Sequence, residues 1–412
     1  MERYLVGMFE RGVKVGALEV AFPSGDRRVF GDGSPPVVRL RLTDAAAVRA
    51  AWLDPSLQFA ELYMHGRLVV EEGDLFDFLA LVKRNGPRNF ASAPAVGYEI
   101  ARMFHRMLRR NVLPETARGN VAHHYDLDER LFRLFLDPDM QYSCAYYEDG
   151  NETLEEAQRK KKRHIAAKMW LAPGQRVLDI GCGWGGMGLY LAQVAGAEVT
   201  GVTLAEEQLR VARQRAEAAG LADRVKFLLA DYRKVEGTFD RVVSVGMFEH
   251  VGPQHFDEYF RTIRRLLTDD GVAVVHSITR AKPNRADPPF VEKYIFPNGH
   301  IPALSEVLPA IERAGLLVKD IEILTMHYAD TLRDWRRRFR ANSAEAIVLY
   351  DETFFRMWDL YLAGAEVSFR YGKLANFQIQ LMRRNRDGPR NRNYIGETEK
   401  LLAAREQSQL TG

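Results

Sequence analysis

Short strand-like runs lie near the start of the chain, and in one of them, residues 37–42, apolar and polar positions alternate as in a strand with one buried face. Two of these runs flank the turn residues Ser24-Gly25-Asp26, so they predict a β-hairpin. Thr43-Asp44 carries the oxygen side chains that favour a helix start. The pattern predicts strands at residues 16–22, 27–30 and 37–42, and helices after residue 44, at 75–82 and at 96–110. We therefore expect a small α+β domain, whose expected role is dimerisation, giving a homodimer, or substrate gathering.

From residue 176 the pattern changes to continuous apolar strands that alternate with helices. The strands are predicted at 176–180, 198–203, 225–230, 241–245 and 272–278, and the helices at 187–195, 205–219 and 256–267. This alternation is typical of a parallel sheet covered on both faces, in which ligands bind beyond the carboxyl ends of the strands. Residues 111–120 hold Pro114 and Gly119 and little apolar periodicity. We therefore predict two consecutive domains, a small α+β domain at 1–120 and a catalytic domain at 121–412.

A glycine-rich loop, Gly181-Cys182-Gly183-Trp184-Gly185-Gly186, follows the first strand of the second domain. Glycines let the backbone turn sharply and approach a ligand closely. The spacing is G-x-G-x-G, whereas dinucleotide sites use G-x-G-x-x-G, and no P-loop lysine follows. The loop resembles that of S-adenosylmethionine-dependent methyltransferases. The expected fold class is α/β, with a Rossmann-like methyltransferase sheet, helical insertions and a smaller α+β domain in front.

The methyltransferase resemblance also implies which residues hold the cofactor. The second strand ends Val202-Thr203-Leu204 without the acid usual in this superfamily, and resembles a branch in which Thr, Leu and Gln contact the cofactor instead. Asp231 and Tyr232 end the third strand and are expected at the adenine, although Tyr232 alone could be a core aromatic. The implied cofactor-binding residues are Tyr142, Ser143, Val177, Asp179, Gly181, Gly183, Gly185, Thr203, Leu204, Gln208, Asp231 and Tyr232.

Several further segments resemble one family, the cyclopropane fatty acid synthases and the related mycolic acid methyltransferases. They are Tyr125-Asp126-Leu127, residues 142–146, 244–252 and 276–278, His327-Tyr328 and residues 361–365. The resemblance spans about residues 121 to 385, and the N-terminal extension resembles the bacterial phospholipid-acting branch. It implies methylene transfer from S-adenosylmethionine to the double bond of unsaturated phospholipid acyl chains. A fatty-acid C-methyltransferase, which would give a methylene or methyl-branched chain, is the alternative, and a non-enzymatic lipid-binding protein on the same fold is a third hypothesis.

Such a reaction passes through a carbocation that must lose a proton, so the site needs a base and no water. In the family, a bound bicarbonate acts as that base. The resemblance maps its ligands to the backbone at Cys144 and Ile278 and to the side chains of Glu249, His276 and Tyr361. Taken singly, Glu249 could be a helix-start acid, His276 a satisfied core histidine and Tyr361 a core tyrosine. Some family members carry a cysteine in the last strand, but residues 377–382 have none.

Composition and charge limit which classes of binding partner are expected. Formal charge is +3 from 58 basic and 55 acidic residues, too balanced to indicate nucleic acid, and no metal site is expected. The stretch Asp287-Pro288-Pro289-Phe290 resembles a motif of adenine-N6 DNA methyltransferases, but no strand precedes it. Two cysteines, no leader-like N-terminus and no long apolar run predict a cytoplasmic protein that meets the membrane peripherally. Basic clusters occur at 159–163, 333–340 and 383–392, and they predict either solvated faces or contact with an anionic bilayer.

Overall fold

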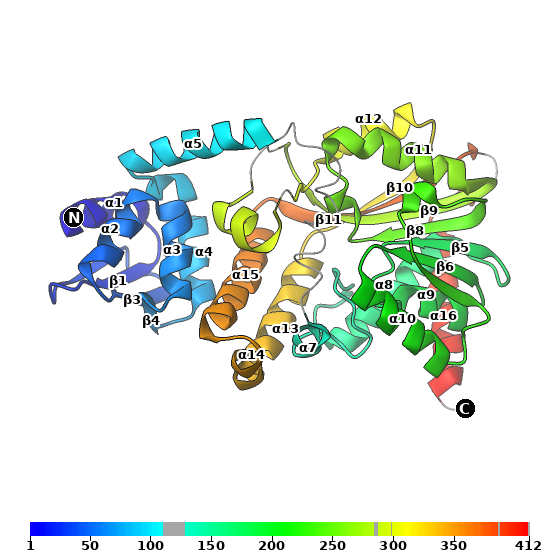
Figure 1. Cartoon of the computed structure of the whole chain (residues 1–412), viewed down its shortest axis with the longest axis horizontal. Coiled ribbons are helices and arrows are strands. Elements are labelled where there is room, and N and C mark those ends of the chain that lie inside the picture. The colour runs from blue at the N-terminus through cyan, green and yellow to red at the C-terminus, as the bar shows by residue number, and fades with distance from the viewer. Residues whose placement is uncertain (110–127, 284–286, 298, 386–387, 411–412) are drawn as a thin grey trace. The chain divides into compact units, whose positions relative to one another are not determined.

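The computed structural model describes residues 1–109, 128–283, 287–297, 299–385 and 388–410 (Figure 1). Its contacts divide the chain into two compact units. Unit 1 is Met1–Thr116, Ala286–Pro297 and Leu332–Lys373, and unit 2 is Ala117–Arg285, Asn298–Thr331 and Leu374–Gly412. The sequence predicted consecutive domains, whereas the contacts group two later segments with the N-terminal residues. The predicted boundary at 111–120 and the motif Tyr125-Asp126-Leu127 lie outside the described residues.

Unit 1 contains a four-stranded sheet in the order β2-β1-β3-β4. The strands are β1 (Ala17–Ala21), β2 (Arg27–Gly31), β3 (Val37–Leu42) and β4 (Leu68–Glu72). The predicted hairpin is confirmed, because β1 and β2 pair antiparallel across a turn in which Gly25 has a φ of 95°. The third strand is also confirmed, and it pairs parallel with β1. Strand β4, which the sequence pattern did not predict, pairs with β3 through a register shift.

The helices of unit 1 come from its N-terminal segment and from its two later segments. Asp44 caps α2 by accepting from the N–H groups of Ala46 and Ala47, as expected of a helix start. Helix α15 packs against α3 and α4, which is why the later segment joins this unit. The elements are α1 (Glu2–Gly12), α2 (Ala45–Leu53), α3 (Pro55–Met64), α4 (Leu75–Arg84), η1 (Pro87–Phe90), α5 (Ala93–Arg109), η5 (Val291–Ile295), most of α13 (His327–Ala341), α14 (Ser343–Leu349) and α15 (Glu352–Arg370).

Unit 2 is built on a seven-stranded sheet in the order β10-β11-β9-β8-β5-β6-β7. Its strands are β5 (Arg176–Ile180), β6 (Glu198–Thr203), β7 (Val225–Leu229), β8 (Phe239–Val245), β9 (Leu267–Arg280), β10 (Leu317–Leu324) and β11 (Leu374–Met382). Strands β5 to β9 pair parallel, as predicted. The prediction does not extend to the edge, where β11 runs antiparallel to both β9 and β10.

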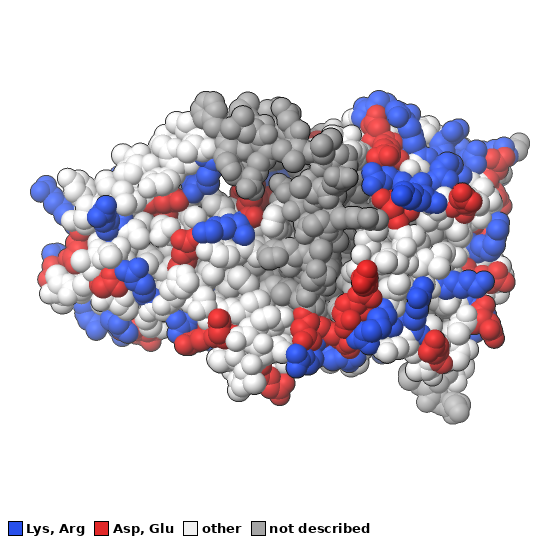
Figure 2. Space-filling model, viewed as in Figure 1, with Lys and Arg blue, Asp and Glu red and all other residues white. Residues whose placement is uncertain are grey.

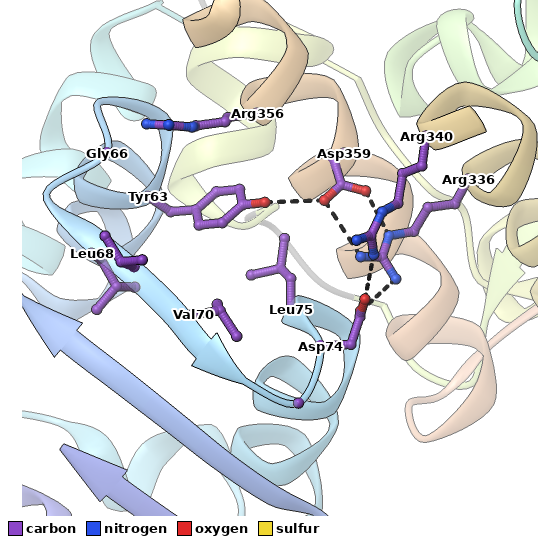
Figure 3. A pocket seen from close by; sticks show the side chains of 12 residues that line it. Tyr63, Gly66, Leu68, Val70, Asp74, Leu75, Arg336, Arg340, Arg356 and Asp359 are labelled. Carbon is purple, nitrogen blue, oxygen red and sulfur yellow. Dashed lines mark hydrogen bonds and ion pairs between the residues drawn. The ribbon is translucent and has the colours of Figure 1, made fainter. Parts of the chain in front are cut away.

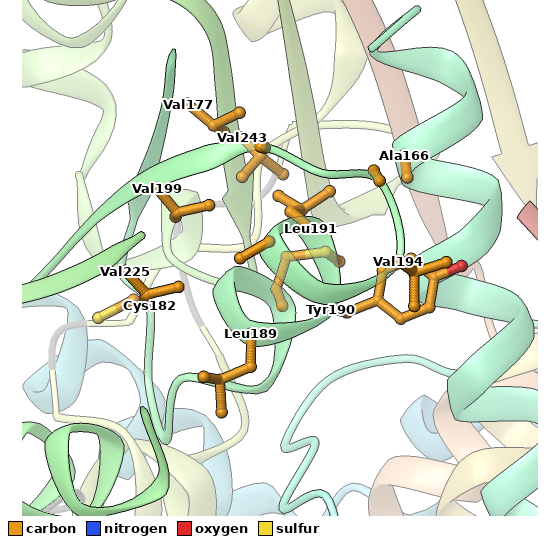
Figure 4. Close-up of a cluster of buried hydrophobic side chains, with 14 of the residues drawn as sticks. Ala166, Val177, Cys182, Leu189, Tyr190, Leu191, Val194, Val199, Val225 and Val243 are labelled. Carbon is orange, nitrogen blue, oxygen red and sulfur yellow. The ribbon is translucent and has the colours of Figure 1, made fainter. Parts of the chain in front are cut away.

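Neighbouring residues of the central strands point into two different cores. Val243 and Val274 lie in one cluster and Val242 and Val275 in the other, because side chains alternate across a sheet. Figure 4 shows the first cluster, to which Val177 and Val243 of the sheet and Leu191 of a covering helix belong. Helices α8 (Leu154–Lys168), α9 (Gly186–Gln193), α10 (Glu206–Ala218) and α16 (Asn393–Leu410) gather on one side of the sheet, and α11 (Phe256–Leu266) and α12 (Leu304–Arg313) on the other (Figure 1). The fold class predicted for this part is confirmed.

Most residues of the basic clusters form ion pairs with acidic side chains of the same chain. In the 159–163 run, Arg163 pairs with Glu406 at 2.5 Å, and Lys161 is fully buried, so the prediction of a solvated face is wrong for Lys161. Arg336 is also buried and pairs with Asp359 at 2.7 Å. On the face drawn in Figure 2, basic and acidic side chains are interspersed.

Among the described residues, no helix is long and apolar enough to cross a bilayer.

Candidate functional site

The glycine loop turns at the carboxyl end of β5 with three glycines in the left-handed region. Gly181, Gly183 and Gly185 have φ values of 79°, 52° and 86°. A Cβ on Gly185 would lie 2.8 Å from the ring of Phe227, and one on Gly181 would lie 2.8 Å from Met247. A Cβ on Gly183 would meet nothing within 4 Å. The outer glycines are thus required by packing, whereas the middle one borders open space where a ligand can approach the backbone.

Asp179 stands two residues before this loop and is buried. Burial raises the pKa of Asp179 to about 7, although the charge of Lys161 acts in the opposite direction. Within the described part of the chain, its Oδ2 atom has no hydrogen-bond partner. A buried acceptor without a partner is costly. Beside an open glycine turn, it fits a ligand with hydroxyl or amino donors, as the predicted cofactor has.

The end of β6 brings two predicted cofactor residues together. The side-chain oxygens of Thr203 and Gln208 lie 3.2 Å apart, and both residues are buried. The Thr203 hydroxyl also accepts from the Ala205 N–H at 3.2 Å. Leu204, between them, exposes 40% of its surface. Its exposed side chain at the carboxyl edge of the sheet leaves an apolar surface for a ligand.

The end of β7 places Asp231 and Tyr232 at the same edge of the sheet. Partial burial raises the pKa of Asp231, but the hydrogen bonds from Arg233 outweigh burial, so the pKa lies below its ordinary value. The shortest of these contacts joins Asp231 Oδ2 and Arg233 Nη2 at 2.6 Å. Tyr232 packs edge-on against Tyr259, with ring centroids 5.6 Å apart. Val177 lies near the start of β5 with its side chain in the core, so packing is the role that the structure assigns to that side chain.

A loop before α8 carries Tyr142, Ser143 and Cys144. The Lys161 ammonium donates to Ser143 Oγ at 2.8 Å and to Gln141 Oε1 at 2.7 Å. The ring of Tyr142 packs edge-on against Phe132, which also lies 5.7 Å from the ring of Trp184 in the glycine loop. The Lys161 contact was missed because the whole basic run was assigned to the surface. The missed signal was the helical spacing of Leu154, Lys161 and Ile165, which places them on one buried face.

Glu249 lies in η3 (Phe248–His250), just after β8. Its Oε1 atom accepts from the Ile278 N–H at 2.7 Å. Its Oε2 atom is buried and has no partner among the residues that the structure describes. Burial raises the pKa of Glu249, which favours the protonated carboxyl. The structure thus brings Glu249 and Ile278 together, as predicted, and leaves one carboxyl oxygen available.

His276, on β9, is buried between two amides of β11. Its ring nitrogens lie 3.2 Å from Gln378 Nε2 and 3.4 Å from Asn376 Nδ2. Burial lowers the pKa of His276 to about 3, so the ring is neutral. A neutral imidazole has one donor and one acceptor nitrogen, so one of the two amides must present its oxygen. The core-histidine alternative accounts for these contacts, and the ligand role stays a prediction.

Cys144 is buried, and burial raises the pKa of its thiol well above the ordinary range. The thiol therefore stays protonated and is a poor nucleophile. Tyr361 belongs to α15 in unit 1, where its ring lies edge-on to Trp358 and Phe296 at 5.3 Å and 5.9 Å. These contacts are those of a packed tyrosine. Its role at the site of Glu249 stays a prediction.

Unit 1 has a separate cavity of about 230 Å³ (Figure 3). On one wall, Arg336 pairs with Asp74 at 2.6 Å and with Asp359 at 2.7 Å, and Tyr63 donates to Asp359 at 3.1 Å. These charges satisfy one another, so we interpret the wall as a structural ion network. The described residues contain no group of three metal-ligating side chains.

Comparisons with known proteins place the chain in a family. The family model described as mycolic acid cyclopropane synthetase matches residues 114–379. A probable fatty acid methyltransferase of Pseudomonas putida is 39% identical over 287 residues, which is 68% of this chain and 73% of that protein. Cyclopropane-fatty-acyl-phospholipid synthase of Escherichia coli K12 is 41% identical over 267 residues, 65% of this chain and 68% of that protein.

Solved structures are similar as well. Mycolic acid cyclopropane synthase CmaA1, complexed with SAH and CTAB, has 35% identity and a TM-score of 0.61, covering 64% of this chain and 97% of that one. Coclaurine N-methyltransferase bound to N-methylheliamine and SAH has a TM-score of 0.64 and covers 79% of this chain and 99% of that one. At 21% identity, this second likeness shows the fold alone.

Proposed function

Because the chain belongs to the mycolic acid cyclopropane synthetase family, we propose that this S-adenosylmethionine-dependent methyltransferase builds a cyclopropane ring on the double bond of unsaturated phospholipid acyl chains. The similarity to a relative named cyclopropane-fatty-acyl-phospholipid synthase supports the substrate class. The observation that carries the reaction is Glu249, a buried carboxyl with one unpartnered oxygen at the carboxyl edge of the sheet.

The proposed reaction requires a site that can stabilise and deprotonate a carbocation. An isolated alkene is a weak nucleophile, and adding a methyl group to it leaves a carbocation that must lose a proton to close the ring. When bound, S-adenosylmethionine supplies the electrophilic methyl group on its sulfonium. The residues around it must therefore exclude water, tolerate positive charge and accept a proton.

The residues that would hold the cofactor lie at the ends of β5 and β6 and in the loop before α8. Gly183 leaves backbone exposed to a ligand, and the free Oδ2 atom of Asp179 can accept from its donors. Thr203 and Gln208 offer polar side-chain atoms at the end of the next strand. Ser143 is held in place by Lys161. This set offers both acceptors and donors, which a zwitterionic ligand with a ribose requires.

Proton removal needs a base, and neither His276 nor Cys144 is suited to that role. The His276 ring is a weak base because its pKa is about 3, and the Cys144 thiol is protonated. We therefore propose that bicarbonate serves as the base near Glu249. A protonated Glu249 can donate from Oε2 to an anion, which fits this group. The Ile278 N–H already donates to Glu249, so in this structure it positions the carboxyl and does not face an open site.

Expression in bacteria rich in monounsaturated lipids tests the product. We expect lipid mass spectra to gain one CH2 per modified chain, and proton NMR to show the high-field signals of a cyclopropane ring. A strain that expresses Glu249→Gln is the control. Lipids that stay unchanged, with protein present and folded, would exclude the proposed reaction.

A second candidate is a fatty-acid C-methyltransferase. It is supported by the similarity to the probable fatty acid methyltransferase and to the tuberculostearic acid methyltransferase of Mycobacterium tuberculosis, which is 40% identical over 288 residues. A methylene branch would give the same mass gain as a ring, but its NMR signals would be vinylic. A saturated methyl branch would add two further hydrogens. The same lipid extracts therefore distinguish the two candidates.

We also propose that the protein takes its acyl chains from an anionic bilayer. Arg337 exposes 71% of its side chain and Arg392 exposes 60%, so both can reach a surface. Each also contacts an acid, Asp334 or Asp320, which reduces its attraction below the roughly 1 kcal/mol per basic residue of a free cation. Co-sedimentation with anionic vesicles, lost in neutral vesicles and at high salt, is the expected result. Equal binding to duplex DNA would argue against a lipid partner.

A further inference from the structure

Lys161 is a fully buried cation whose direct partners are neutral. Its ammonium donates to Gln141 Oε1 at 2.7 Å and to Ser143 Oγ at 2.8 Å, and none of its side chain is exposed. Burying an ammonium is costly unless an opposite charge or hydrogen bonds compensate for the lost water. Two neutral acceptors compensate only in part. The position of this lysine therefore calls for a functional explanation.

The two acceptors connect Lys161 to the glycine loop and to β8. Gln141 packs against the start of α9, because a Cβ added to Gly186 would lie 2.2 Å from Gln141 Nε2. Ser143 lies against the end of β8, where its Cβ is 3.7 Å from the position of a Cβ on Gly246. Gln158, one turn before Lys161 on α8, holds the same loop by donating to the carbonyl oxygens of Gln141 and Ser143 at 3.2 Å and 3.0 Å.

Two of the nearby acids, Asp137 and Asp139, are engaged by other groups, and Asp179 forms no ion pair with Lys161 although its charge interacts with the lysine. Asp139 pairs with Lys162 at 2.5 Å and also with Arg215. Asp137 accepts from the backbone N–H groups of Gln141 and Asp139, at 3.0 Å and 3.1 Å. No carboxylate of the described residues forms an ion pair with Lys161. Its positive charge is thus available to a ligand that brings a carboxylate.

We propose that Lys161 is a positioning residue for the amino-acid end of S-adenosylmethionine: it holds Ser143 and Gln141 in place, and its charge favours the carboxylate of the bound cofactor. The proposal for Lys161 rests on the S-adenosylmethionine dependence of the family and not on the identity of the lipid product. The proposal concerns binding, so it is tested without substrate turnover.

Two ligands separate the charge effect from general damage. S-adenosylhomocysteine carries the amino-acid end, and 5′-methylthioadenosine has the same nucleoside and thioether without it. For Lys161→Met, calorimetry should show S-adenosylhomocysteine binding about ten- to a hundredfold more weakly, in the range of a lost charge-assisted hydrogen bond. The affinity for 5′-methylthioadenosine should change less than about threefold. Lys160→Met is the matched control, because Lys160 contacts Glu148 and Glu152 instead and should leave both affinities unchanged.

A pH series adds a readout that a merely structural role would not move. Burial lowers the pKa of Lys161 to about 8, so its charge is lost as the pH rises through that value. The charged or titratable groups around it are Asp137, Asp139, Cys144, Lys162, Asp179 and His276. Between about pH 7.5 and pH 9.5, the affinity advantage of wild type over Lys161→Met should shrink for S-adenosylhomocysteine.

The outcomes are distinct. Equal losses for both ligands in Lys161→Met, or an advantage that does not change with pH, would overturn the proposal. If Lys161→Met does not fold by circular dichroism, Lys161→Arg replaces it. Retention of S-adenosylhomocysteine affinity within about tenfold supports the charge role. A larger loss of S-adenosylhomocysteine affinity overturns it. A lipid product other than the one proposed would leave these binding results intact, so the two failures can be told apart.

Discussion

Glu249 and Ile278 face each other across the carboxyl ends of β8 and β9, with the Ile278 N–H donating to Glu249 Oε1 at 2.7 Å. This contact fixes the carboxyl while its other oxygen remains buried, with no partner in the described part of the chain. A carboxyl anchored at one oxygen, with the other oxygen lacking a partner, suits a site that must hold an anionic base without water.

Glu249→Gln should lower turnover by about two orders of magnitude or more while cofactor affinity changes little. Glutamine can still accept from the Ile278 N–H and donate to an anion, so the fold of the site is kept, but its amide cannot pass a proton to or from the bound base. Single-turnover rates on unsaturated lipid and S-adenosylhomocysteine calorimetry measure the two effects separately. A variant that loses cofactor binding but keeps its single-turnover rate would contradict this role.

Alanine at Gly185 should mainly lower stability, whereas alanine at Gly183 should mainly weaken ligand binding. Gly185→Ala forces a Cβ to within 2.8 Å of Phe227 at a φ of 86°, and we expect a loss of stability of about 2 kcal/mol or more. Gly183→Ala meets nothing within 4 Å, so it should cost about 1 kcal/mol of stability but weaken S-adenosylhomocysteine binding clearly. Urea denaturation and calorimetry distinguish them. Equal destabilisation by both changes would refute this reading of the loop.

His164 should contribute stability that depends on pH. Burial lowers the pKa of His164, but hydrogen bonds to Glu322 and Glu399, each at 2.7 Å, outweigh burial and raise it above its ordinary value. The raised pKa means that the stabilisation is complete below the unfolded-state value of about 6.5 and is lost as the pH rises through the folded-state pKa. The difference in free energy of unfolding between wild type and His164→Gln should therefore shrink as the pH rises. A difference that grows with pH would have the wrong sign.

Arg336→Ala should destabilise unit 1 by about 3–5 kcal/mol, because it leaves the buried Asp359 carboxyl without its cation. Arg337→Ala is the matched control: the neighbouring guanidinium is 71% exposed, and its removal should change the free energy of unfolding by less than about 0.5 kcal/mol. Denaturant titrations of both variants provide the measurement. Similar losses in the two would show that the ion network adds nothing specific.

Local pattern predicted strands β5 to β9 and helices α9, α10 and α11 of unit 2, because the strands of a sheet covered on both faces read as short apolar runs. The runs around Val177 and Val243 are of this kind, and so is the glycine loop that follows the first of them. Helices α8, α12 and α16 and strand β10 were not predicted. Strand β4 and helix α3 were missed because their apolar residues form no clear period by themselves. The antiparallel edge was missed because strand direction at an edge depends on the path of the connections and not on composition.

The sequence alone was sufficient for the family and the glycine loop, because each of these is a matter of side-chain chemistry at a fixed spacing. It could not tell a buried lysine with neutral partners from neighbouring cations that pair with acids. Lys160 and Lys161 are adjacent and chemically identical, yet one pairs with Glu148 and Glu152, while the other is enclosed against Ser143 and Gln141. Only the packing of α8 against a loop about 20 residues earlier separates them. Burial and partners then set the charge state, for Lys161 as for Asp179 and Glu249.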